Sequence, residues 1–279
     1  MTIREALQWA RSQLPASPTP HEDARLLLQH VLGASHTYLA AHHEQELAAA
    51  QEQQYRTLVA RAVRLEPIPY ITGEASFYGL DFIVTPDVLI PRPETEHLVE
   101  AATAWAKTHA ARRIVDVGTG SGCIAVLLAQ GLPQADILAI DVSQAALAVA
   151  RRNVQRHRAG RIRIQQGTLL ESVDNPVDLI VANLPYISDP EWTALDDGVK
   201  WYEPVAALRG GPDGLDLIRR LLQQAVPLLR PGGAIFLEIG WRQGDAAREL
   251  AQTFFPAARI VVRADYAGHD RLVIIDTSY

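Results

Sequence analysis

Short apolar runs alternate with segments of helical periodicity from residue 93 of this 279-residue chain onward. The runs span residues 114–117, 137–140, 162–165, 177–182 and 234–239, and helices are expected at 94–110, 121–130, 144–157, 215–229 and 243–254. Apolar strands joined by helices pair in parallel, with helices on both faces of the sheet. Two final runs, at 259–263 and 272–275, have no helix between them and predict an antiparallel pair at one edge. The pattern therefore predicts an α/β fold with a mostly parallel seven-stranded sheet and an antiparallel edge strand.

The part of the chain before residue 67 carries helical periodicity only. It predicts helices at 3–14, 21–32 and 44–65 and a short helical piece near Tyr38. Prolines and an alternating stretch at 77–84 follow, and they predict a β-hairpin that turns near Gly79. We therefore expect a helical domain at 1–66, which the family resemblance described below implies to be a substrate-recognition domain, a β-hairpin linker at 67–92 and an α/β domain at 93–279.

Composition argues against several classes of protein. The net charge of -6 argues against a protein that binds nucleic acid by neutralising a long phosphate backbone. The densest basic run, at 151–158, fits the end of a helix, where the helix dipole favours cations. Cys123 is the one cysteine, so we expect no disulfide, no metal site of the CxxC type and a reducing, cytoplasmic location. Charges at helical spacing in residues 1–14 predict neither a signal peptide nor a membrane span.

A glycine-rich turn, Gly118-Thr119-Gly120-Ser121-Gly122, follows the first strand of the α/β domain. Its Gly-x-Gly-x-Gly spacing differs from the Gly-x-Gly-x-x-Gly of dinucleotide folds, which disfavours NAD and FAD. The next strand ends at Asp141, whose carboxylate can accept hydrogen bonds from both ribose hydroxyls of a nucleoside. A purely structural turn, or Asp141 as a helix N-cap, remains an alternative, although Ser143 can fill the capping position. Turn and acid together predict a nucleoside site.

The tetrapeptide Asn183-Leu184-Pro185-Tyr186 directly follows the strand at 177–182. Asn183 offers a side-chain carbonyl and Leu184 a backbone carbonyl, while Tyr186 offers a flat apolar wall. Such a loop can hold the NH2 group of a planar amide or amine and aim its nitrogen at an electrophilic methyl group. Because parallel strands end at the same edge of the sheet, we expect this loop to face the nucleoside site.

Two further features have competing interpretations. Prolines bracket Arg92 just before the helix at 94–110, so the block is either a rigid helix entry or a place where Arg92 and Thr95 face a ligand. Cys123 follows the glycine turn, but no histidine is placed by the sequence to activate it, so we expect a small buried residue rather than a nucleophile.

The order and spacing of these motifs resemble those of the protein-(glutamine-N5) methyltransferases, and in particular the branch that modifies peptide chain release factors. The resemblance covers nearly the whole chain and implies a Rossmann-like class I methyltransferase fold. Further matching segments lie at residues 23–28, 69–73, 77–79, 90–96, 203–204, 210–215, 231–233, 237–240 and 267–271.

The resemblance implies S-adenosyl-L-methionine as cofactor and the glutamine of a Gly-Gly-Gln motif in a release factor as acceptor. It assigns the cofactor to Gly118, Thr119, Gly120, Ser121, Gly122, Asp141, Thr168 and Asn183. It assigns glutamine binding and catalysis to Asn183, Leu184, Pro185 and Tyr186. Two positions depart from the family pattern, because Leu184 stands where the family has a proline and Gly167-Thr168 replaces an acidic residue after the third strand.

Three other functions remain open on the sequence alone. They are glutamine methylation of a ribosomal protein, adenine-N6 methylation of RNA or DNA, and nucleoside binding without catalysis. The adenine alternative arises because the loop at 183–186 also resembles that of ribosomal RNA adenine dimethyltransferases, and the acidic balance of the chain counts against it. We expect a release factor as partner, no contact with membranes or nucleic acid, and a monomer.

Overall fold

The computed structural model describes residues 1–278, which divide into two compact units. The first unit comprises Met1–Glu74 together with Asp196–Tyr202, and the second comprises Ala75–Leu195 and the chain from Glu203 onward. A short segment from the middle of the sequence therefore belongs with the N-terminal helices. The expected domain boundaries near residues 66 and 92 remain a proposal.

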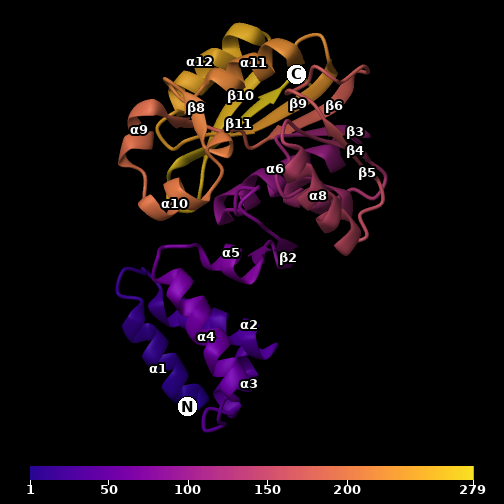
Figure 1. The fold of residues 1–279 in the computed structure, drawn as a ribbon. Coiled ribbons are helices and arrows are strands. Elements are labelled where there is room, and N and C mark those ends of the chain that lie inside the picture. The colour runs from indigo at the N-terminus through magenta and orange to yellow at the C-terminus, as the bar shows by residue number, and fades with distance from the viewer. Residues whose placement is uncertain (279) are drawn as a thin grey trace. The chain divides into compact units, whose positions relative to one another are not determined.

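The first unit is a small bundle of helices (Figure 1). Its core consists of apolar side chains at helical spacing, among them Ile3, Leu27 and Leu28, around the ring of Tyr55. The Tyr55 hydroxyl donates a hydrogen bond of 2.8 Å to the backbone carbonyl of Ala24, so its polar end is satisfied inside the core. The helices are α1 (Ile3–Gln13), α2 (Pro20–Leu32), α3 (His36–Ala41), α4 (Ala49–Ala62), α5 (Ile68–Thr72) and α10 (Asp197–Tyr202).

The expected helix at 44–65 is wrong at its start, because α4 begins at Ala49. Residues 45–47 instead pair with the N-terminus: the amides of Ile3 and Leu47 donate to the carbonyls of Gln45 and Met1, each at 2.9 Å. Residues 45–47 are therefore extended rather than helical, because their backbone forms hydrogen bonds with the distant N-terminus. Helical periodicity is a local pattern and does not reveal such distant hydrogen bonds.

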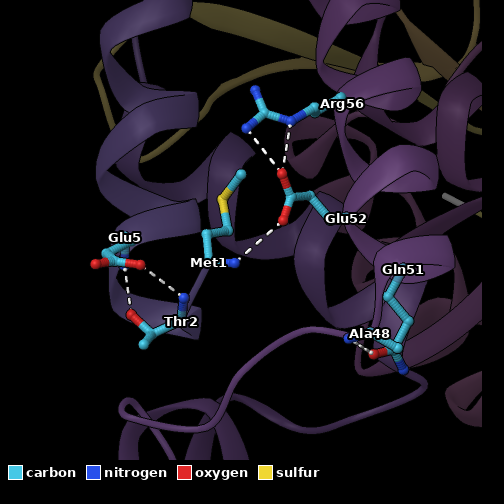
Figure 2. A network of polar contacts seen from close by, with 7 residues as sticks. All are labelled: Met1, Thr2, Glu5, Ala48, Gln51, Glu52 and Arg56. Carbon is cyan, nitrogen blue, oxygen red and sulfur yellow. Dashed lines mark hydrogen bonds and ion pairs between the residues drawn. The ribbon is translucent and has the colours of Figure 1, made fainter.

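Polar contacts hold the start of α1 to α4 (Figure 2). Thr2 and Glu5 form a capping box, in which each side chain accepts a hydrogen bond from the other's backbone amide. Glu52 lies 3.1 Å from the Met1 amino group through one oxygen and accepts two hydrogen bonds from Arg56 through the other (Figure 2). These contacts orient the two helices whose apolar faces form the core.

The expected hairpin turn at Gly79 is confirmed. Strands β1 (Glu74–Phe77) and β2 (Leu80–Ile83) flank Tyr78 and Gly79, which have φ values of 50° and 74°. Left-handed conformations at both central residues match the twist of a two-residue hairpin. The helix α5 in this region was not predicted; it has a proline in its first turn and is capped by Gly73 with φ 79°.

The second unit is built on a seven-stranded sheet with the order β10-β11-β9-β6-β3-β4-β5 among the described residues. Neighbours from β9 to β5 pair in parallel, whereas β11 runs antiparallel to both β9 and β10. The antiparallel pair of β10 and β11 at one edge is confirmed, with β10 as the edge strand and β11 next to it. The strands are β3 (Arg113–Val117), β4 (Asp136–Asp141), β5 (Ile162–Gln166), β6 (Val177–Ala182), β9 (Leu229–Glu238), β10 (Arg259–Ala264) and β11 (Asp270–Asp276).

Helices cover both faces of this sheet (Figure 1). Ile114 and Leu179 pack with α6 and α7 on one face, and their neighbours Val115 and Ile180 pack with α11 and α12 on the other. Burying each such side chain contributes roughly 1.5–3 kcal/mol, so the alternation fixes the register of the strands. The helices are α6 (Glu96–Thr108), preceded by a 3-10 turn η1 (Pro93–Thr95), α7 (Cys123–Gly131), α8 (Gln144–Arg156), α11 (Asp216–Ala225) and α12 (Gly244–Phe254).

The segment between β6 and α11 contains elements that the sequence analysis did not predict. A two-residue strand, β7 (Ile187–Ser188), pairs in parallel with β8 (Arg209–Gly211). Between them lie the helix α9 (Asp189–Ala194), the segment that belongs to the first unit, and a 3-10 turn η2 (Val205–Ala207). Such short strands form only when distant residues meet, so periodicity does not reveal them.

Candidate active site

A cavity of about 360 Å³ lies at the carboxyl edge of the parallel strands. The loops that follow β3, β4, β5 and β6 line it, as expected for a ligand site in an open α/β sheet. Of the residues predicted for the site, the cavity brings together Gly118, Thr119, Gly120, Ser121, Asp141, Thr168, Asn183, Leu184 and Pro185. Gly122 and Tyr186 do not line it.

The glycine turn is shaped by close approaches as well as by its backbone. Gly118 has φ +72°, and a Cβ on it would lie 3.1 Å from Cδ2 of Leu184. Gly122 has φ +81°, and a Cβ there would lie 3.2 Å from the Cβ of Ala150 on α8. Gly122 thus packs α7 against α8 behind the cavity, while the turn in front of it exposes backbone to the ligand.

Asp141 is held by two backbone amides. Its carboxylate accepts hydrogen bonds of 2.9 Å from the amides of Gly120 and Ser143. The Ser143 hydroxyl caps α8 by accepting from the amide of Ala146 at 3.1 Å, as expected. A carboxylate has about four acceptor positions, so Asp141 keeps capacity for ligand hydroxyls in the cavity that it lines.

Gly167 packs closely against Ser172. A Cβ on Gly167 would lie 2.4 Å from the hydroxyl oxygen of Ser172, so a side chain at this position would require Ser172 to move. Both residues line the cavity, and the Gly167 amide donates to the backbone carbonyl of Asp141 at 3.1 Å. The loop after β5 is therefore tied to the loop after β4 by backbone rather than by an acidic side chain.

The loop after β6 divides its side chains between the cavity and the core. The Asn183 amide nitrogen donates a hydrogen bond of 3.1 Å to the Thr95 hydroxyl, and Leu184 is only 4% exposed. Gln243 donates to the Tyr186 carbonyl at 2.9 Å and thereby holds the loop from α12's N-cap position. The Tyr186 hydroxyl lies 3.4 Å from Glu238, away from the cavity lining.

Arg92 and Thr95 both line the cavity, which favours the ligand-facing interpretation of their block. Arg92 forms an ion pair with Glu203, a carboxylate that is 4% exposed and also accepts from the Ile90 amide at 3.3 Å. In the sequence, Glu203 stands out only as part of a segment that matches the family. Its contacts with Arg92 and Ile90 are visible only in the tertiary structure.

Two family models match the chain. Residues 5–73 match the PrmC N-terminal domain, and residues 95–195 match the Methyltransferase small domain. A release factor glutamine methyltransferase from Bordetella pertussis is 44% identical over 255 residues, which cover 91% of this chain and 93% of the relative. One from Koribacter versatilis is 38% identical over 278 residues and covers 98% of both chains.

The chain belongs to the release factor glutamine methyltransferase family. A solved methyltransferase from Pyrococcus furiosus has the same α/β fold, with a TM-score of 0.53 at 19% identity over 81% of this chain and 98% of that one. The predicted class I methyltransferase fold is confirmed.

S-adenosyl-L-methionine is the cofactor of this methyltransferase family. The cavity fits it, because the glycine turn lines the cavity without side chains at Gly118 and Gly120, and Asp141 retains acceptor positions for a ribose. The assignment of Thr168 to the adenine and of Asn183 to both ligands stays a prediction.

Two buried acids lie near the carboxyl ends of β3 and β9. Asp116 at the end of β3 is fully buried and accepts a hydrogen bond of 2.6 Å from Thr119, and burial raises its pKa to about 7. Burial likewise raises the pKa of the Glu238 carboxyl, at the end of β9, to about 7. Cys123 is buried in the first turn of α7, as expected, and burial raises its thiol pKa to about 12, so it is not poised as a nucleophile.

Residues 1–278 contain neither a candidate membrane span nor a candidate metal cluster. No helix there combines the length and the apolar composition that crossing a bilayer requires. His, Cys, Asp and Glu side chains in the same residues form no group of three able to hold a metal ion.

Proposed function

We propose that this chain transfers the methyl group of S-adenosyl-L-methionine to the side-chain amide nitrogen of the glutamine in the Gly-Gly-Gln motif of a peptide chain release factor. One observation carries the proposal: Asn183 and Leu184, with their two carbonyl acceptors, line the same cavity as the glycine turn and Asp141. The membership of the chain in the release factor glutamine methyltransferase family supports the choice of acceptor.

An amide nitrogen is a poor nucleophile because its lone pair is delocalised into the carbonyl group. The carbonyls of Asn183 and Leu184 would accept its two N–H groups and turn the lone pair toward the reacting carbon. The bound cofactor supplies an electrophilic methyl group on a sulfonium sulfur. The bond between the methyl carbon and sulfur would break as the N–C bond forms, with a neutral thioether as the leaving group. The amide proton would pass to solvent in the same step or afterwards, so positioning and electrostatics would supply the acceleration.

Apolar side chains in the cavity wall support this mechanism. Val117, Ile140, Leu184 and Leu217 line the cavity together with the polar groups described above. Closing such a wall around the reactants excludes water, which strengthens each hydrogen bond to the acceptor amide. Tyr186 does not line the cavity, so its contact with Glu238 would support the loop rather than hold the plane of the amide.

The helical unit is proposed to contact the release factor away from its glutamine. A tripeptide offers too little surface for specificity, and a stable protein interface buries roughly 1,200–2,000 Å² in total. We propose that the chain acts as a monomer, without direct contact to nucleic acid, and in the cytoplasm, where a translation factor would be met. Light scattering of the purified protein tests the first of these statements, and a salt-dependent gel shift with RNA tests the second.

The decisive experiment incubates the purified protein with S-adenosyl-L-methionine and a release factor, followed by mass mapping. We expect one added methyl group on the glutamine of the Gly-Gly-Gln peptide and none on a release factor with Gly-Gly-Ala. Methylation of a ribosomal protein or of adenine in RNA, with the release factor unmodified, would overturn the proposal. A matched Asn183→Ala variant should lose at least about a hundredfold in turnover while it still binds the cofactor.

A further inference from the structure

Gln243 is a buried amide at the N-cap position of α12, with 8% of the residue exposed. Its Nε2 donates hydrogen bonds to two backbone carbonyls, that of Tyr186 at 2.9 Å and that of Asp213 at 3.2 Å. Its Oε1 accepts from the amide of Gly240 at 2.8 Å. A side-chain amide has two N–H groups and one carbonyl oxygen, so both hydrogens and the oxygen have partners. The reversed amide would set oxygen against two carbonyls, and the contacts therefore fix its orientation.

The loops that Gln243 joins include the loop that carries the substrate acceptors. Tyr186 ends the tetrapeptide 183–186 after β6, Asp213 lies between β8 and α11, and Gly240 follows β9. Strands β6 and β9 are parallel neighbours, so their loops leave the same edge of the sheet. Gln243 does not line the cavity. It can therefore act on the cavity only through the loops that it holds.

Glycines let the backbone of residues 210–214 lie directly against the tetrapeptide. A Cβ on Gly210 would lie 2.5 Å from the Pro185 carbonyl oxygen and 2.8 Å from the Cα of Tyr186. A Cβ on Gly214 would overlap with the Tyr186 carbonyl oxygen. The peptide groups on both sides of Tyr186 are thus held by backbone packing as well as by the hydrogen bond from Gln243.

Pro185 couples these contacts to the carbonyl of Leu184. That carbonyl belongs to the rigid peptide group between Leu184 and Pro185, and the next peptide group is the one that packs against Gly210. Of the two backbone dihedrals of Pro185 that separate these groups, the ring fixes φ. The proline also restricts Leu184 itself to extended conformations. Holding the peptide groups after Pro185 therefore leaves one soft dihedral between them and the Leu184 carbonyl.

We propose that Gln243 is a positioning residue for methyl transfer: by holding the Tyr186 peptide group against residues 210–214, it aims the backbone carbonyl of Leu184 at an N–H group of the acceptor amide. The inference rests on the proposed function, because only an acceptor NH2 group needs that carbonyl. A misplacement of about 1 Å in such a group costs on the order of a hundredfold in rate. Binding of the partner depends on a wider surface. The expected signature is a lower kcat with little change in the KM for the release factor or in cofactor affinity.

Gln243→Glu removes the donor end of the amide and keeps its size. The new side chain retains an oxygen for the Gly240 amide's partner position but sets a second oxygen against the Tyr186 carbonyl. We expect kcat to fall at least about tenfold, with the KM for the release factor and the cofactor dissociation constant within about threefold. Gln252→Glu is the matched control, because its exposed amide near the other end of α12 donates to the Pro256 carbonyl at 2.8 Å. It should retain kcat within about twofold.

Gly210→Ala disturbs the same peptide groups without changing Gln243. The added Cβ would displace the Pro185 carbonyl, so we expect kcat to fall at least about tenfold with both affinities within about threefold. Gly160→Ala is its control, because no atom lies within 4 Å of a Cβ there. Urea unfolding of each variant identifies conditions in which it is folded, which separates a loss of stability from a loss of rate.

A second readout does not depend on turnover. The amide of Ile187, the residue after the tetrapeptide, donates to the Leu208 carbonyl at 2.9 Å. Its exchange with solvent deuterium should be at least about tenfold faster in Gln243→Glu than in the wild type and unchanged in Gln252→Glu. Unchanged exchange in Gln243→Glu would show that Gln243 does not hold the loop.

The failures of the two proposals are distinguishable. A wild-type protein that modifies no release factor would overturn the proposed function, and the exchange of the Ile187 amide would still test whether Gln243 holds the loop. With an active wild type, folded Gln243→Glu and Gly210→Ala variants of normal kcat would overturn the positioning role. A loss of cofactor affinity as large as the loss of kcat would also count against it, because the contacts would then support the whole cavity rather than the Leu184 carbonyl.

Discussion

The side chain of Leu184 occupies the space that Gly118 leaves beside the cavity. A Cβ on Gly118 would lie 3.1 Å from Cδ2 of Leu184, and Leu184 is 4% exposed within the apolar layer under α11 and α12. The leucine that departs from the family pattern is therefore a packing residue of the glycine turn. Its backbone carbonyl remains available for the substrate, because the side chain and not the main chain makes this contact.

Gly118→Ala should destabilise the protein and weaken cofactor binding. The substitution combines a φ of +72° with the close approach to Leu184, and we expect a loss of about 1–3 kcal/mol in unfolding free energy by urea denaturation. Gly79→Ala is the matched control, because its φ is +74° and no atom lies within 4 Å of the added Cβ. Equal losses in both variants would show that the contact with Leu184 contributes nothing.

Leu184→Ala separates packing from catalysis. Truncating this buried side chain should lower the unfolding free energy by about 2–4 kcal/mol through the cavity that it leaves. At a temperature where the variant is folded, turnover should stay within about tenfold of the wild type, because the backbone carbonyl is retained. A complete loss of turnover in a folded Leu184→Ala protein would assign the side chain a direct role.

Asp141→Ala should weaken cofactor binding through two effects. It removes the acceptor expected for the ribose and it releases the amides of Gly120 and Ser143. We expect the cofactor dissociation constant, measured by calorimetry, to rise by about ten- to a hundredfold. Asp141→Asn retains one acceptor oxygen and should fall between the wild type and Asp141→Ala. A dissociation constant unchanged in both variants would refute the assignment of Asp141 to the ribose.

Asp116 should make the stability of the protein fall as pH rises. Its pKa is about 7 in the folded state and 3.8 is its ordinary value, so the folded state binds the proton more tightly. Between these values the unfolding free energy therefore decreases with pH, by at most about 1.4 kcal/mol per pH unit for one proton. Asp116→Asn should make the curve less steep across this window, while Glu238, whose pKa is also raised to about 7, keeps its own contribution. Denaturation curves at several pH values test this, and parallel curves for the two proteins would contradict it.

The fold was largely predictable because its main elements are local patterns. Apolar runs and helical periodicity located the strands and helices of the sheet, and a Tyr-Gly pair located the hairpin turn. The prediction failed where distant backbone competes with local preference, as at residues 45–47, and where an element exists only through pairing, as in β7 with β8. In both cases the deciding hydrogen bonds join residues far apart in the sequence.

Most residues of the candidate site could also be predicted from the sequence. Motifs at strand ends fall on one edge of a parallel sheet, so Gly118, Asp141 and Asn183 meet at one cavity as expected. Tyr186 could not be placed from the sequence, since its direction depends on the buried Glu238. Glu238 and Glu203 also carry no local signal, because an acid at the end of an element is ordinarily exposed to solvent.

The sequence by itself determined the order of elements, the sheet with its covered faces and the motifs that meet at its edge, because each depends on periodicity or on turn chemistry. Only the tertiary structure decided which polar groups are buried together. It joined Asn183 to Thr95 and Tyr186 to Glu238 by hydrogen bonds and set Leu184 against Gly118. Burial and hydrogen-bond partners depend on contacts between segments that are distant in the sequence, so the sequence of one segment does not determine them.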